Sequence, residues 1–123
     1  MLGMKTLMTC LSLTVVDGDT LKCDGESLRL IGSGAPNVEG YDAPETWKPR
    51  CQRELQLGLL AKDRLGEIVQ QPGARIETTA ARDRYGRILA SVRLRDGRTA
   101  GEVLIEEGLA SVWRPGYRAS WCD

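Results

Sequence analysis

The stretch LSLTVVDGDTLKCDGESLRLI, residues 11–31, determines the expected fold. Leu11–Val16 is rich in Leu and β-branched residues and predicts a strand that ends at the turn signal Asp17-Gly18-Asp19. A second short strand is expected at Thr20–Cys23. Asp24-Gly25 favours a hairpin turn, and Ser27–Ile31 then alternates outward and inward as a third strand does. The first quarter of the chain therefore predicts a meander of three strands.

The rest of the chain predicts two helices and further strands. Cys51–Gln70 carries a broad apolar stripe at helical spacing, and Gln71-Pro72-Gly73 stops this helix. Shorter elements are expected as strands at Arg75–Thr79, Ile88–Leu94 and Leu109–Trp113 and as a helix at Gly101–Glu107. The fold class that we expect is mainly β with helices (α+β), a barrel of about five strands of the OB-fold type with one long and one short helix.

Length and composition limit the functions that are open to this chain. Its 123 residues predict a single domain, residues 1–123. No apolar run is long enough to cross a bilayer, so no membrane partner is expected. Lys plus Arg and Asp plus Glu both number 17, so any site for a polyanion must be a local cluster. Histidine is absent, which excludes Ser-His-Asp, Cys-His and HExxH chemistry and leaves carboxylates, Lys, Tyr, Cys or metal-bound water for proton transfer.

Several polar residues are candidates for chemistry, each with an ordinary alternative. Asp19, Asp42 and Glu45 stand in loops beside strands and offer the oxygen ligands that calcium prefers, although Asp-Gly-Asp is common in plain turns and Glu45 could simply be solvated. Two arginines, Arg29 and Arg87, suit phosphate binding but could equally form surface salt bridges. Aromatic residues beside cations suit stacked bases: these are Tyr85 next to Arg84, and Trp113, whose alternative is a place in the core.

Four short motifs occur in a fixed order along the chain, and this order is a more specific signal of a protein family than any single motif. Asp-Gly-Asp-Thr follows a strand (residues 17–20), Arg-Leu-Ile-Gly lies on a strand (29–32), Asp-Ala-Pro-Glu-Thr precedes a helix (42–46), and Asp-Arg-Tyr-Gly-Arg precedes a strand (83–87). Together they resemble the staphylococcal nuclease (thermonuclease) family, in its small bacterial form, from about Leu13 to Trp113. Residues 101–110 also resemble that family's second helix and its exit.

This resemblance implies an OB-fold and calcium-dependent hydrolysis of DNA and RNA phosphodiesters, with single-stranded or locally melted nucleic acid as the substrate of a monomer. The residues carried over from the family's motifs are the calcium ligands Asp19, Asp42 and the backbone carbonyl of Ala43, the general base Glu45, the phosphate-binding Arg29 and Arg87, the nucleotide-contacting Arg84 and Tyr85, and Trp113 near an aromatic of the same site.

The chain departs from the family's pattern in two places. Ser33–Tyr41 is inserted between the arginine-bearing strand and the Asp-Ala-Pro-Glu segment. This insertion could move Asp42 relative to Arg29 or cover the substrate cleft. Two Gly and a Pro disfavour regular pairing, so we expect Gly32–Tyr41 to be a loop near the active site. The chain also ends soon after Trp113, without the long C-terminal helix of the best-known members.

Two other functions are compatible with the fold. One is a nucleic-acid-binding module that has lost catalysis. Such a module has little physical reason to keep the carboxylates and phosphate-binding arginines together, which are Asp19, Arg29, Asp42, Glu45 and Arg87. The other is a structural or protein-interaction domain in which the Arg–carboxylate pairs are surface salt bridges. A calcium-dependent thermal shift separates the second alternative from the nuclease.

The cysteines are Cys10, Cys23, Cys51 and Cys122, and none forms a CxxC pair. They are either buried thiols or disulfides, for which three full connectivities exist. We expect a Cys51–Cys122 bridge that pins the irregular tail, and no second bridge, because residue 13 and not Cys10 should face Cys23. A Cys51–Cys122 disulfide favours a secreted or periplasmic protein, and reduced thiols a cytoplasmic one. Met1–Cys10 superficially suggests a signal peptide, but we expect it to be part of the fold.

Overall fold

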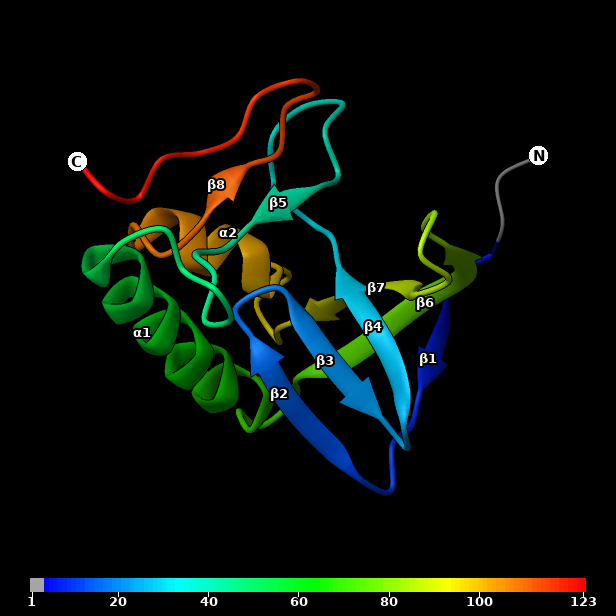
Figure 1. Ribbon diagram of the computed structural model, residues 1–123. Coiled ribbons are helices and arrows are strands. Elements are labelled where there is room, and N and C mark those ends of the chain that lie inside the picture. Colours follow the sequence, from blue (N-terminus) through cyan, green and yellow to red (C-terminus); the bar gives the residue numbers. More distant parts are fainter. Residues whose placement is uncertain (1–3) are drawn as a thin grey trace.

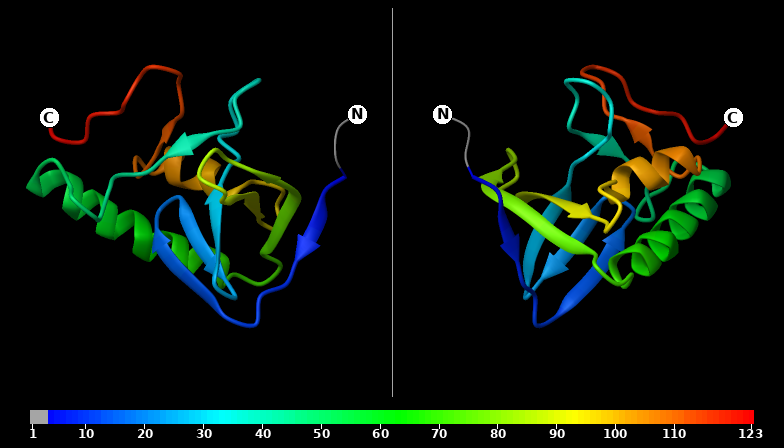
Figure 2. Two further views of the ribbon diagram at one scale, coloured as in Figure 1. Left: turned by 45° about the vertical axis from the view of Figure 1, so that its right-hand side comes forward. Right: turned by 180° about the vertical axis from the view of Figure 1, so that it is seen from behind.

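Strands form most of the structure, a computed structural model that describes residues 4–123, and two helices lie together on one side of it (Figures 1 and 2). The elements in chain order are β1 (Thr6–Met8), β2 (Leu13–Asp17), β3 (Thr20–Cys23), β4 (Glu26–Leu30), β5 (Tyr41–Asp42), α1 (Gln52–Val69), β6 (Arg75–Arg82), β7 (Ile88–Arg93), α2 (Ala100–Glu106) and β8 (Ser111–Val112). The predicted three-strand meander, both helices and the strands after α1 are confirmed, with ends shifted by a few residues.

The main sheet has the strand order β1-β6-β7-β4-β3-β2. Its pairs are antiparallel except β4 with β7, which run parallel. The two edge strands, β1 and β2, are consecutive in the chain, so the sheet curls until its edges approach each other at the bend of residues 9–12 (Figure 1). Within residues 4–123 no ladder joins these edges, so the α+β OB-like class is confirmed but the closed five-stranded barrel is wrong: the sheet has six strands and stays open.

Aliphatic side chains fill the space between the sheet and the helices, as a chain without Phe requires. The largest fully buried apolar side chains include Leu21, Leu28, Leu30, Leu65, Ile68, Val92, Leu104 and Tyr41. They come from β3, β4, β5, β7 and both helices, so one core supports the whole described chain. Neither helix among the described residues is long and apolar enough to cross a bilayer.

Two short strands were not predicted from the sequence. β1 spans three mostly exposed residues and β5 only two, and strands this short do not show a detectable alternation of apolar and polar residues. β5 pairs with β8, which places Tyr41 opposite Val112 and Asp42 opposite Ser111. This small second sheet ties the segment before α1 to the segment after α2.

The four cysteines form two disulfides. The expected Cys51–Cys122 bond is present, with a Cα–Cα distance of 5.9 Å. The expectation that Cys10 and Cys23 stay apart is wrong, because they are bonded with a Cα–Cα distance of 5.3 Å. Two disulfides are typical of proteins from oxidising compartments.

A bend in the chain explains the unexpected bridge. Leu13 faces Cys23 in the β2–β3 ladder, as the hairpin count predicted. At the next pair one backbone bond remains, from the Asp24 amide to the Ser12 carbonyl at 2.8 Å, but the Ser12 amide donates to the Asp24 carboxylate at 2.7 Å and not to a backbone carbonyl. The chain turns at this point, which brings Cys10 back beside Cys23.

The two disulfides should stabilise the fold unequally. Cys51 and Cys122 are 71 residues apart in sequence and Cys10 and Cys23 only 13, so the first bond restricts the unfolded chain more. We expect the Cys51→Ala/Cys122→Ala variant to lose about 4 kcal/mol of unfolding free energy and Cys10→Ala/Cys23→Ala about 3 kcal/mol, measured by urea denaturation. Each double variant is the control for the other, and the reverse order would contradict the prediction.

Candidate active site

All nine residues that the sequence singled out line one polar cleft of about 450 Å³. The cleft lies where the β2–β3 turn, β4, β5 and the β6–β7 turn meet the C-terminal tail. The predicted residues along its wall are Asp19, Arg29, Asp42, Ala43, Glu45, Arg84, Tyr85, Arg87 and Trp113. Acidic, basic and aromatic side chains from segments far apart in the sequence therefore line the same cleft.

Arg29 lies at the centre of the acidic side of the cleft. Its guanidinium forms ion pairs with Asp19 (Nη1–Oδ2, 2.5 Å) and Asp42 (Nη2–Oδ1, 2.7 Å) and donates to the Tyr41 carbonyl at 2.7 Å. The Arg29 and Asp19 side chains are only 16% and 12% exposed, so both charges are largely desolvated. The β3–β4 register places Thr20 opposite Arg29, which directs Arg29 toward the β2–β3 turn. The insertion has therefore not separated Asp42 from Arg29.

The β2–β3 turn fixes Asp19 from several directions. Asp19 accepts hydrogen bonds from the Ala43 amide and from the Thr20 hydroxyl, both 3.0 Å long. Gly18 lets this turn approach α1, since a Cβ there would lie 2.7 Å from the Ala43 Cβ and 2.9 Å from that of Ala61. Asp-Gly-Asp therefore does more than form an ordinary turn, because Asp19 also joins this turn to the Asp-Ala-Pro-Glu segment.

Two carboxylates of the cleft, those of Asp17 and Glu45, have no ion-pair partner within residues 4–123. Burial raises the pKa of Asp17 to about 7, with the charge of Asp19 contributing. Desolvation also raises the pKa of Asp42, despite the opposing effect of Arg29, and that of Glu45 on the exposed rim, where Asp19 adds to the effect. For Asp19, burial acts in the same direction, but the charge of Arg29 and the hydrogen bonds from Arg29, Asp17 and the Ala43 amide together outweigh it, so the pKa is lowered. Negative charge is thus held in the cleft at an energetic cost.

The oxygen atoms of this cluster suit a hard cation. Asp19, Asp42 and Ala43 line the cleft and can offer two carboxylates and a backbone carbonyl, and the carboxylates of Asp17 and Glu45, which form no ion pair within residues 4–123, lie on the same wall. Among residues 4–123 no three acidic or Cys side chains lie close enough to hold a metal by themselves. A cation here would complete its shell with carbonyl and water oxygens, as calcium commonly does.

The opposite side of the cleft comes from the β6–β7 turn. Asp83 accepts from the Arg87 guanidinium (Nε–Oδ2, 2.8 Å) and from the Arg87 amide (2.9 Å), which fixes both residues. Arg84 lies over the Tyr85 ring, 4.9 Å from its centre, and donates to the Tyr85 hydroxyl at 2.7 Å. Tyr85 is 69% and Trp113 44% exposed, so the alternative that Trp113 belongs to the core is wrong. Both rings are partly exposed to solvent, and the Tyr85 ring also lies against the guanidinium of Arg87, 5.5 Å from its centre.

Sequence reasoning missed the contribution of the C-terminal tail. Tyr117, Arg118, Ala119 and Trp121 line the cleft, as do Asp17, Thr20, Arg50 and Glu54. The expected Cys51–Cys122 bond could have indicated this contribution, because Cys51 follows Glu45 by six residues and a tail bonded there must pass close to the site.

The insertion forms a loop that reaches the edge of this cleft without covering it. No strand occurs along Ser33–Val38, which confirms that part of the expectation. Most of the loop borders a separate cavity of about 460 Å³ with β6 and β7, and none of residues 32–40 lines the cleft within the described chain. Its end lies beside the cleft wall, because the Gly40 carbonyl accepts a hydrogen bond of 3.0 Å from the Trp113 amide.

Comparison with known families agrees with this geometry. The sequence model described as staphylococcal nuclease homologue matches residues 37–120. The chain belongs to the staphylococcal nuclease family. The match includes every predicted site residue except Asp19 and Arg29, which the structure joins to Asp42 by the ion pairs described above. Among the curated proteins compared with this chain, none is significantly similar.

The raised pKa of Asp17 predicts that replacing this carboxyl by a neutral amide stabilises the protein, and that the gain in unfolding free energy depends on pH. Because the folded-state pKa of about 7 exceeds the ordinary 3.8, this group lowers the unfolding free energy as pH rises from about 4 to 7. Asp17→Asn should therefore stabilise the metal-free protein by about 1–3 kcal/mol at pH 8 and have little effect at pH 4, measured by urea denaturation. Asp63→Asn, on the exposed face of α1, is the control. An equal effect of Asp17→Asn at both pH values would contradict the assignment.

Proposed function

We propose that this protein is a calcium-dependent nuclease that hydrolyses phosphodiester bonds of DNA and RNA by attack of water. The observation that carries this proposal is the convergence of the predicted acids, arginines and exposed aromatic rings on one cleft. A domain that used its charges only for surface salt bridges would have no reason to concentrate unneutralised carboxylates beside arginines in a single cleft.

The acidic side of the cleft fits the proposed cation. Asp19, Asp42 and the Ala43 carbonyl would hold calcium. When bound, calcium supplies Lewis-acid stabilisation of the charge on the phosphate. The buried contacts of Asp19 with Arg29 and with the Ala43 amide keep these oxygens in place before any ligand arrives.

Glu45 and the two arginines supply the remaining chemistry. Glu45 is exposed on the rim, where water reaches it, and its raised pKa makes its carboxylate a better proton acceptor. Arg29 and Arg87 both line the cleft, and their fixed positive charges complement the negative charge that grows on the phosphate in the transition state. The Asp83 contacts orient Arg87 for this role.

The aromatic rings favour a flexible, unpaired substrate. Tyr85 and Trp113 expose ring surface on which bases of a single strand stack, with the cation of Arg84 beside them for the backbone. Bases in a regular duplex are already stacked on each other. The proposed substrate is therefore single-stranded or locally melted DNA and RNA, bound by a monomer. The two disulfides support a secreted or periplasmic location.

Catalysis should fail when either Glu45 or Arg87 is altered. We expect Glu45→Gln to lower kcat by about 10²–10⁴-fold, and Arg87→Ala by about 10²–10³-fold, with much smaller losses of DNA affinity, because both groups act on the transition state. The measurement is cleavage of a labelled single-stranded oligonucleotide with calcium and with a chelator. Asp63→Asn and Arg53→Ala, both on the exposed face of α1, are the matched controls. Binding by the unaltered protein without cleavage would favour the inactive binding module instead.

Calcium should also stabilise the fold. At a concentration of about 100 times its Kd, calcium adds about 2.7 kcal/mol to the unfolding free energy, which corresponds to a rise in Tm of about 10 °C. Asp42→Asn should abolish this shift, whereas Asp63→Asn should keep it. An equal rise in Tm for Asp42→Asn and the unaltered protein would place the cation elsewhere.

A further inference from the structure

The C-terminal tail forms part of the cleft although it contains no helix or long strand. After β8 the chain runs past β5 and α2 to the start of α1 (Figure 1). On this path Tyr117, Arg118, Ala119 and Trp121 reach the cleft wall. An irregular terminus of this kind normally frays unless contacts fix it.

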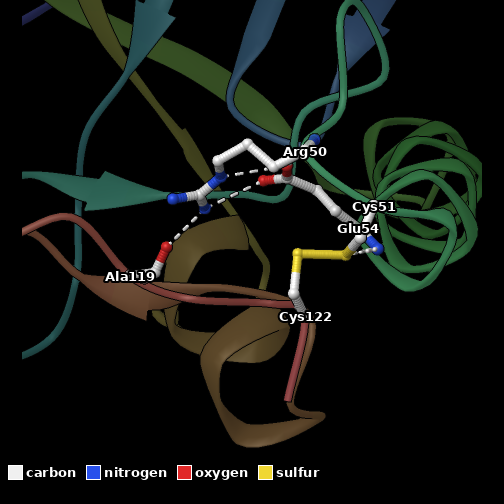
Figure 3. The surroundings of a disulfide bond; sticks show 5 residues. All are labelled: Arg50, Cys51, Glu54, Ala119 and Cys122. Carbon is white, nitrogen blue, oxygen red and sulfur yellow. Dashed lines mark hydrogen bonds and ion pairs between the residues drawn. A yellow bond between two sulfur atoms is a disulfide. The ribbon is translucent and has the colours of Figure 1, made fainter.

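Two contacts fix the tail at the start of α1 (Figure 3). Cys122 is bonded to Cys51, the N-cap residue of α1. Arg50 donates to the Ala119 carbonyl at 2.6 Å, and Arg50 is itself held by Glu54, whose side chain is 1% exposed and accepts from the Arg50 amide at 2.7 Å. Arg118 lies between β8 and these contacts, directly before the held carbonyl.

Arg118 differs from the other cations of the cleft. Arg29, Arg50 and Arg87 are all committed to carboxylates, and Arg84 donates to the Tyr85 hydroxyl. Within residues 4–123, Arg118 forms neither a side-chain hydrogen bond nor an ion pair, and its residue is exposed. Its charge reaches the acidic side of the cleft, since it acts on the carboxyls of both Asp42 and Glu45.

We propose that Arg118 is a substrate-binding residue that contacts a backbone phosphate of the nucleic acid, and that the Cys51–Cys122 disulfide holds it over the cleft. This inference rests on the proposed function. A guanidinium that has no internal partner loses no ion pair when it binds a phosphate, unlike Arg29 or Arg87. A phosphate bound by Arg118 lies beside the acidic side, so Arg118 aligns the strand next to the phosphodiester bond that water attacks with Glu45 as the proton acceptor.

The first test compares two arginines of the same tail. Arg118→Ala should weaken binding of a labelled single-stranded oligonucleotide about tenfold and reduce the slope of log affinity against log salt by about 0.7, the value for one phosphate contact. Arg114→Ala is the matched control, because Arg114 is also exposed in the tail but does not line the cleft. Fluorescence anisotropy in calcium, with Glu45→Gln in all variants to prevent cleavage, gives both quantities. Arg118→Lys should preserve the salt slope, which a merely structural role would not require.

The second test concerns the disulfide. Cys51→Ala/Cys122→Ala should reproduce the binding loss of Arg118→Ala, and adding Arg118→Ala to it should have no further effect, because the two changes remove the same contact. Cys10→Ala/Cys23→Ala also lacks one disulfide but should bind normally. Equal binding and salt slopes for Arg118→Ala and Arg114→Ala would overturn the inference, even where the unaltered protein cleaves DNA. If the unaltered protein neither binds nor cleaves nucleic acid, the proposed function itself fails.

Discussion

The Arg29 guanidinium connects the segments that form the cleft. It lies between Asp19 on the β2–β3 turn and Asp42 on β5, and it also binds the Tyr41 carbonyl. A largely buried charge is tolerated only with close, hydrogen-bonded partners, and removing one partner of such a pair costs about 3–5 kcal/mol. The position of the whole Asp-Ala-Pro-Glu segment relative to the sheet therefore depends on this one side chain, because β5 is only two residues long and provides little pairing of its own.

The same interaction explains why the cleft is electrostatically unfavourable. Arg29 is shared between Asp19 and Asp42, and it leaves Asp17 and Glu45 without a direct cationic partner among the described residues. Burial, to which the charge of Asp19 adds, raises the pKa of Asp17 to about 7. Such an arrangement lowers stability, and the aliphatic core and two disulfides must offset it. Several ionisable groups with shifted pKa values in one cleft are typical of ligand-binding and catalytic sites.

Local sequence signals predicted most of the fold, because turn dipeptides, alternation and helical spacing act over short distances. The nine predicted residues of the cleft came instead from the four motifs that resemble the family, and the local signals alone left ordinary alternatives for each of them. The failures all required long-range information. β5 exists only because β8 lies beside it, and Cys10 meets Cys23 only because Asp24 bends the chain before the hairpin. Arg118 has no motif around it, and only the Cys51–Cys122 bond brings it to the cleft. Residues whose position depends on a distant contact are those that a local pattern cannot reveal.

The insertion shows how the site tolerates a change in chain length. Its two ends are joined by a bridge between Ile31 and Gly40, and the Gly32 amide donates to the Glu39 carbonyl at 2.6 Å. Gly32 adopts a φ of +106°, and a Cβ there would lie 2.7 Å from Thr99, so a glycine is needed for the chain to turn at this point. Because the base of the loop is closed, the chain re-enters the fold beside the place where it left. The extra residues project toward a separate cavity, and the distance between Arg29 and Asp42 is independent of how many residues lie beyond the closed base.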